Sequence, residues 1–137
     1  MNEQSPEKVL RGFISSMHRW ELDAWARSRA VRDMPDPSSY QAEVMEKMKA
    51  IFAEFCTSKE RPYGRQGSFQ KPPEYDPHAE EVVEINHVSR HRTEITTQRS
   101  TGFSEKRRYV LLKENGRWRI DNAKAVNEDG TTRQATL

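Results

Sequence analysis

Cysteine is almost absent from this sequence, in which Cys56 is the single thiol. A lone thiol cannot form an internal disulfide, which excludes a small secreted fold held together by disulfides. No apolar run approaches the ~18 residues needed to cross a bilayer, and no charged-then-apolar leader opens the chain. We therefore expect a cytoplasmic protein with no membrane partner.

Apolar residues are also scarce, at 34% of the chain against 32% charged residues. The protein should still fold, because three Trp, four Tyr and five Phe supply large buriable side chains. The net charge is only +2, too close to neutral to indicate nucleic-acid binding. The length fits one globular unit, so we expect residues 1–137 to form a single domain with a thin core.

Two amphipathic helices are predicted in the first half of the chain. Ser-Pro-Glu at residues 5–7 is typical of a helix start, because it combines a capping hydroxyl, a proline and an acid. Apolar residues then recur every three or four positions until about residue 29. An Asp-Pro pair at residues 36–37 repeats the start signal, and the same spacing continues to residue 57.

A long loop is predicted over residues 58–77, where four prolines and two glycines interrupt any regular element. It has room for a short edge strand around residues 68–70. Loops of this length in a compact domain are often functional. Tyr63, Phe69 and Tyr75 are suitable anchors for a partner, or alternatively pack the loop onto the domain.

Strands follow the loop. Residues 80–88 and 92–98 are rich in β-branched side chains, and strict alternation would place Val83, Ile85 and His87 on one face of the first strand. His87 and His91 do not form a metal site in this arrangement. Four residues of strand span about 13 Å, too far for one ion.

Asn115-Gly116 predicts a two-residue hairpin turn, since both residues tolerate positive φ. The turn fixes a register of facing pairs: Glu114 with Arg117, Lys113 with Trp118, Leu111 with Ile120, and Tyr109 with Asn122. One face then carries the apolar set Tyr109, Leu111, Trp118 and Ile120, which should pack against the helices. The other face carries most of the charge, including Arg108, Arg117, Arg119 and Asp121.

Helices followed by antiparallel strands define an α+β protein, with N-terminal helices packed on a curved antiparallel sheet. This order, ending in a Tyr-x-Leu, turn, Trp-x-Ile hairpin, resembles the cone-shaped nuclear-transport-factor-two-like fold.

Several motifs resemble a narrower family, the immunity proteins of bacterial polymorphic toxin systems that share this fold. They are MHRWE at residues 17–21, FCTSKERPYGR at 55–65, SFQKPPEYDP at 68–77, Thr97-Gln98, and RYVL with WRID within 108–121. They span nearly the whole chain in order. The resemblance implies a protein that binds and neutralises a cognate toxin without catalysis or a cofactor. Relatives of this fold often dimerise through the sheet, so a homodimer is a second expectation.

The contact surface is predicted on physical grounds, because aromatic and arginine side chains tend to dominate interface energies. It combines the long loop with the charged sheet face, through the residues Arg61, Tyr63, Arg65, Phe69, Tyr75, Arg108, Arg117 and Arg119. Between residues 88 and 119 there are nine Lys or Arg against three Glu. Few aromatics accompany these cations on one face, which argues against nucleic acid. A solvated sheet face is the plain alternative.

An enzyme of the isomerase, cyclase or dehydratase kind, working inside the cone, is the alternative function. Its best available set is Asp121 with Tyr40, Tyr109 or His18. The predicted register places Asp121 on the face opposite Tyr109, however, and a surface ion pair with an arginine suits Asp121 better. A cone filled by Phe13, Trp20 and Trp118 would argue against such an enzyme.

Overall fold

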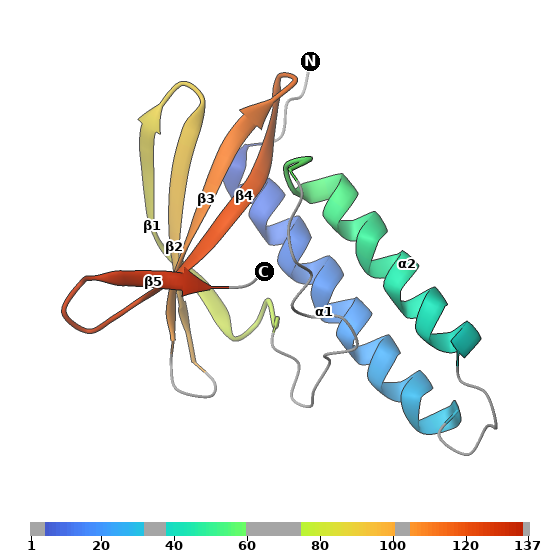
Figure 1. The fold of residues 1–137 in the computed structure, drawn as a ribbon. Coiled ribbons are helices and arrows are strands. Elements are labelled where there is room, and N and C mark those ends of the chain that lie inside the picture. The colour runs from blue at the N-terminus through green and yellow to red at the C-terminus, as the bar shows by residue number, and fades with distance from the viewer. Residues whose placement is uncertain (1–4, 32–37, 60–74, 101–104, 136–137) are drawn as a thin grey trace.

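The computed structural model describes residues 5–31, 38–59, 75–100 and 105–135. Two helices precede five strands, as the sequence predicts for an α+β protein (Figure 1). The elements are α1 (Pro6–Val31), α2 (Ser38–Phe55), β1 (Glu80–Ser89), β2 (Arg92–Arg99), β3 (Lys106–Glu114), β4 (Arg117–Val126) and β5 (Thr132–Ala135).

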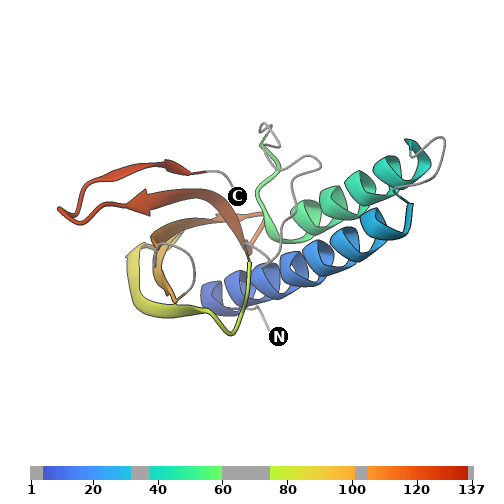
Figure 2. The same cartoon turned by 90° about the horizontal axis from the view of Figure 1, so that it is seen from below.

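The strands form one antiparallel sheet in the order β1-β2-β3-β4-β5, so each strand pairs with its neighbours in the chain. The two helices lie side by side, and the sheet curves beside the first turns of α1 (Figures 1 and 2). This arrangement places one face of the sheet toward the helices. The opposite face, which carries Arg108, is called the outer face below.

The start of α1 follows the predicted capping chemistry. The Ser5 hydroxyl accepts a hydrogen bond from the Lys8 amide at 3.2 Å, and Glu7 forms an ion pair with Arg11 one turn later. Further along, the Trp20 indole donates to the Val44 carbonyl at 2.9 Å. This bond fixes α1 against α2.

The core is organised around Phe13, which is fully buried. Its ring makes edge contacts with Phe52, Phe55 and Tyr75 at centroid distances of 5.6, 6.3 and 5.4 Å. Trp20 is buried in the same cluster and Trp118 packs against it. Phe13, Trp20 and Trp118 therefore fill the interior. A filled interior argues against an enzyme that works inside the cone.

The predicted hairpin register is confirmed near the turn and wrong beyond it. Glu114 faces Arg117, Lys113 faces Trp118 and Leu111 faces Ile120, with Asn115 and Gly116 both at positive φ. Beyond Ile120 a bulge shifts the pairing by one residue, so Tyr109 faces Ala123 instead of Asn122. The extra residue is Asp121, and the shift places small, buried Ala123 opposite buried Tyr109.

The predicted alternation of β1 is wrong for Val83 and confirmed for Ile85 and His87, which still share one face. The pairing with β2 shifts between Val82 and Glu84, and again between His87 and Ser89. Val83 is the extra residue of the first bulge. Val82 therefore shares a face with Ile85, which is nevertheless 37% exposed. Strand β5 has no counterpart in the sequence prediction. The Asp129-Gly130 turn before it was the available signal, since Gly130 has φ +87°.

Candidate functional site

Four of the predicted contact residues, Arg61, Tyr63, Arg65 and Phe69, lie outside the described residues, as does the expected short edge strand at 68–70. The structure does describe the other four, and it separates them. Tyr75 belongs to the interior, Arg108 to the outer face, and Arg117 and Arg119 to the hairpin end of β4.

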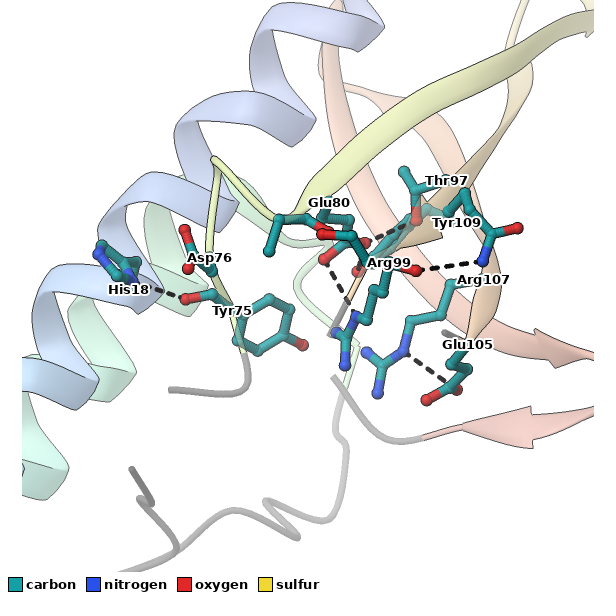
Figure 3. A network of polar contacts seen from close by, with 12 residues as sticks. His18, Tyr75, Asp76, Glu80, Thr97, Arg99, Glu105, Arg107 and Tyr109 are labelled. Atoms are coloured by element: carbon teal, nitrogen blue, oxygen red, sulfur yellow. Dashed lines mark hydrogen bonds and ion pairs between the residues drawn. The ribbon is translucent and has the colours of Figure 1, made fainter. Parts of the chain in front are cut away.

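Tyr75 is a core residue and not a surface anchor, because its side chain is fully buried. Its backbone is held on α1 by two bonds: its amide donates to the Glu21 carboxylate at 3.0 Å, and its carbonyl lies 2.8 Å from the His18 ring nitrogen Nδ1. Figure 3 shows the contact of the Tyr75 carbonyl with His18. Of the two alternatives that the sequence left open for Tyr75, packing onto the domain is the correct one.

Two arginines accompany Tyr75 in the interior. The guanidinium groups of Arg99 and Arg107 lie 5.6 and 5.8 Å from the centre of the Tyr75 ring. Their side chains are only 9% and 5% exposed. Buried guanidinium groups need compensation, which Arg99 receives from Glu80 and Arg107 from Glu105 (Figure 3).

Glu80 is the centre of this cluster, with a side chain that is 1% exposed. Its carboxylate accepts hydrogen bonds from the Thr97 hydroxyl at 2.6 Å, the Tyr109 hydroxyl at 2.8 Å and Arg99 Nε at 3.3 Å. We call Tyr75, Glu80, Thr97, Arg99, Arg107 and Tyr109 the inner cluster. Three donors already occupy the Glu80 carboxylate, an arrangement that stabilises the fold rather than presenting a base to a substrate.

The ionisation of the inner cluster follows from burial and from Glu80. Burial, and then the charge of Glu80, raise the pKa of the Tyr109 hydroxyl well above its ordinary value. Burial and the nearby Arg107 lower the pKa of Arg99, but Glu80 and the two tyrosines outweigh them, and the net shift is upward. Tyr109 thus stays a neutral donor and Arg99 a cation.

Asp121, the carboxylate of the alternative enzyme set, lies elsewhere. It accepts a hydrogen bond from the Thr57 hydroxyl at 2.8 Å and forms an ion pair with Lys59 at 3.1 Å. Asp121 and Tyr109 thus bind different groups, and the described ion pair of Asp121 is with a lysine and not with the predicted arginine. Asp121 and its partners hold the chain after α2 against β4.

Arg119 also joins α2 to the sheet and is not the solvent-facing charge predicted for it. Its Nη1 donates to the carbonyls of Ala53 at 2.6 Å and Cys56 at 3.3 Å, at the C-terminal end of the helix. Cations at this end of a helix satisfy its last carbonyls and offset the helix dipole. Arg117 is exposed beside the turn, as predicted.

A groove of about 430 Å³ opens between the end of α2 and the β3–β4 turn. Sequence reasoning missed it, because it depends on how the helix end docks beside the hairpin. Three cations face it with one carboxylate, Glu114, which accepts hydrogen bonds from Ser58. The polar lining residues are Lys49, Thr57, Ser58, Lys59, Glu114, Asn115 and Arg119.

The outer face carries two cations, Arg108 and Lys124, that have no described counterion and could bind a partner. Arg108 faces Lys124 across β3 and β4, and Thr96 of β2 lies on the other side of Arg108. Both cations are half-buried, and neither forms an ion pair with any residue that the structure describes. Like charges that face each other across two strands destabilise a sheet. An acidic group of a partner, placed beside Arg108 and Lys124, would therefore relieve this repulsion.

In the part of the chain that the structure describes, no three His, Cys, Asp or Glu side chains gather as a metal site. His87 instead lies 3.2 Å from the Thr93 hydroxyl. Among the described helices, none is long and apolar enough to cross a membrane.

The filled interior, the fully engaged Glu80 carboxylate and the half-buried cations of the outer face fit an α+β protein that binds a partner rather than one that holds a substrate in its interior. The family described as NTF2 fold immunity protein matches residues 5–134. The immunity protein RhsIA of Dickeya dadantii (strain 3937) is 35% identical over 117 residues, which cover 84% of this chain and 82% of the relative. No solved structure shows a significant match.

The chain belongs to the family of NTF2-fold immunity proteins. It is therefore an immunity protein, which binds and neutralises the cognate toxin of a bacterial polymorphic toxin system and is not an enzyme. The family also confirms the fold that the order of helices and strands predicted.

Proposed function

We propose that this protein neutralises its toxin by binding an acidic surface of the toxin on the outer face and in the neighbouring groove. The carrying observation is the opposition of Arg108 and Lys124, two cations without described counterions. A toxin carboxylate placed between them would remove their repulsion and form two charge-assisted contacts. Complementary charge would also speed the encounter of the two proteins.

The groove extends this proposed surface toward the hairpin turn. Lys49, Lys59 and Arg119 line it, and exposed Arg117 follows the same turn. Lys59, the last described residue before residue 60, is bound to Asp121 of β4 and lines the groove. We therefore retain Arg61, Tyr63, Arg65 and Phe69 as proposed contacts, and we leave Tyr75 out because it is buried.

The direct test is survival of cells that express the adjacent toxin together with variants of this protein. We expect the double variant Arg108→Glu/Lys124→Glu to lose protection, since it would repel an acidic toxin surface. Arg11→Glu is the control, because Arg11 is an exposed arginine on α1. Full protection by the double variant, at equal expression and melting temperature, would overturn the proposed surface.

We also propose that the protein acts in the cytoplasm and that residues 1–137 form one domain. The second proposal is supported by the core, to which both helices and the strands β2, β3 and β4 contribute. Nucleic acid is not part of the proposal, because the described cross-strand partners of Arg108 and Lys124 include no aromatic side chain on which bases would stack.

A second copy of the chain is the other partner that we propose, held through the sheet. The supporting observation is the edge strand β1, in which the apolar residues Val83, Ile85 and Val88 are exposed. This self-association is independent of toxin binding, because β1 lies two strands away from Arg108 in the sheet order.

A further inference from the structure

Strand β1 is a long sheet edge with exposed apolar residues. No described strand pairs with its outer side, and residues 83–89 are all exposed. Val83, Ile85 and Val88 are 51%, 37% and 50% exposed, and they account for three of the four exposed large apolar residues in the described chain. The opposite edge, β5, is only four residues long and mostly polar. Edges of the β1 kind tend to pair with another strand.

We infer that β1 pairs antiparallel with β1 of a second copy of this chain, across a two-fold axis that passes beside Ile85. The inference rests on the proposed self-association through the sheet and specifies its contact. Two five-stranded sheets would then become one continuous sheet, in which main-chain hydrogen bonds provide the attachment and the exposed apolar side chains are covered.

The charge distribution along β1 favours antiparallel over parallel pairing. The first half of the strand carries exposed Glu81 and Glu84, whereas exposed Arg90 follows its end. Antiparallel pairing brings the acidic half of one copy toward the arginine of the other copy. Parallel pairing would instead place the glutamates of the two copies side by side, which destabilises a sheet.

The position of the axis follows from the pleat. Facing residues of antiparallel strands point to the same face, so a two-fold axis must pass beside a residue that faces its own copy. The regular part of β1 between its two bulges offers only residues 84–87 for this role. A self-facing Glu84 would oppose like charges, whereas a self-facing Ile85 forms an apolar pair. Glu84 then faces Asn86 of the partner subunit.

The bulges also limit the strength of the contact. Bulges twist an edge and interrupt its pairing, so the regular contact between the two copies is short. We expect a dissociation constant on the order of 10 µM, typical of a small interface.

Analytical ultracentrifugation of the full chain across micromolar concentrations tests the contact. We expect the wild-type protein to shift from monomer to dimer as its concentration rises, and Ile85→Lys to remain monomeric. Leu22→Lys is the matched control, because Leu22 is a similarly exposed apolar residue (46%) that lies on α1. We expect this control to dimerise like the wild type.

Disulfide trapping tests the register. Ile85→Cys should form a covalent dimer under mild oxidation, since self-facing residues bring their Cβ atoms to about 5 Å. Glu81→Cys should not, because it would face Ser89 of the partner subunit. The native Cys56 is 2% exposed and gives little background.

Each result separates this contact from the proposals on which it rests. A wild-type protein that stays monomeric overturns both the contact and the self-association. A dimer that persists in Ile85→Lys overturns the contact alone. Loss of toxin protection by Ile85→Lys, with no dimer in the wild type, would assign the edge to the toxin instead.

Discussion

The inner cluster and the outer face contain similar side chains in opposite situations. Inside, Arg99 and Arg107 are almost fully buried, and Glu80 and Glu105 compensate their charges. Outside, Arg108 and Lys124 face each other half-exposed, without a described counterion. The guanidinium group alone therefore does not identify a binding site. The two sites differ in whether carboxylates of the same chain already neutralise the cations.

The two faces of the sheet therefore have different roles, one in stability and the other in binding. Alternate residues of β3 point to opposite faces, so Arg107 supports the interior while its neighbour Arg108 is available to a partner. Substitutions inside should change the free energy of unfolding, and substitutions outside should change toxin affinity. The variants below test this division, beginning with the largest expected effect.

Removing the Glu80 carboxylate should cost the most stability. Glu80→Ala leaves Arg99 with an uncompensated buried charge and two hydroxyl donors without their acceptor, a loss of about 3–5 kcal/mol in the free energy of unfolding. Denaturant titration measures it. The neighbouring Glu81→Ala is the control, because Glu81 is exposed and should change stability by less than about 0.5 kcal/mol. Equal effects at the two positions would contradict the role of the inner cluster.

A smaller loss is expected at Gly12, where α1 meets the Phe55 ring. A Cβ atom at Gly12 would lie 2.8 Å from Phe55 Cε1, so the ring must move. Gly12→Ala should destabilise the protein by about 1–3 kcal/mol, although alanine favours helices. The double variant Gly12→Ala/Phe55→Leu should recover part of this loss in the same titration. A Gly12→Ala protein that is more stable than the wild type would show that the Phe55 ring moves aside at little energetic cost.

The role of Arg119 at the end of α2 predicts a loss of about 1–2 kcal/mol for Arg119→Met, because the last carbonyls of the helix lose a charged donor. Arg117→Met should leave the free energy of unfolding unchanged, since Arg117 is exposed. Thermal unfolding of the two variants measures the contrast. Equal melting temperatures for Arg119→Met and Arg117→Met would contradict the bonding of Arg119 to α2 and support the solvent-facing role predicted from the sequence.

The smallest effect concerns pH. A hydrogen bond from Arg27 lowers the pKa of Glu43 from 4.5 to about 2. A carboxylate with a depressed pKa in the folded state stabilises the protein above its unfolded pKa, and this contribution disappears as the pH falls. The difference in unfolding free energy between wild type and Glu43→Gln should therefore narrow between pH 4.5 and pH 2. A difference that stays constant over this window would contradict the role of the Arg27–Glu43 ion pair.

The sequence predicted local features well because local chemistry determines them. The Asn115-Gly116 turn fixed the first pairs of the hairpin, and apolar spacing placed both helices within a few residues of their observed ends. The bulge after Ile120 was not predictable from the turn, because the turn fixes only the adjacent pairs, whereas the bulge brings Ala123 opposite Tyr109 in the buried part of the sheet.

The candidate site was predicted only in part, for a related reason. Arg108 and Arg117 lie on the surface as expected, whereas Arg119 is engaged by α2 and Tyr75 by the core. These engagements join residues more than fifty positions apart, and no local pattern reports them. The inner cluster and the outer face therefore differ in whether carboxylates of the same chain neutralise the cations, and not in the number of cations that each contains.

The most direct test of the division between the two faces is the affinity of Arg108→Glu/Lys124→Glu for the purified toxin, measured by titration calorimetry. We predict about 100-fold weaker binding than for the wild type, at an unchanged melting temperature, because both charges of the outer face are reversed. Wild-type affinity in this double variant would contradict the account and show that the toxin binds another surface.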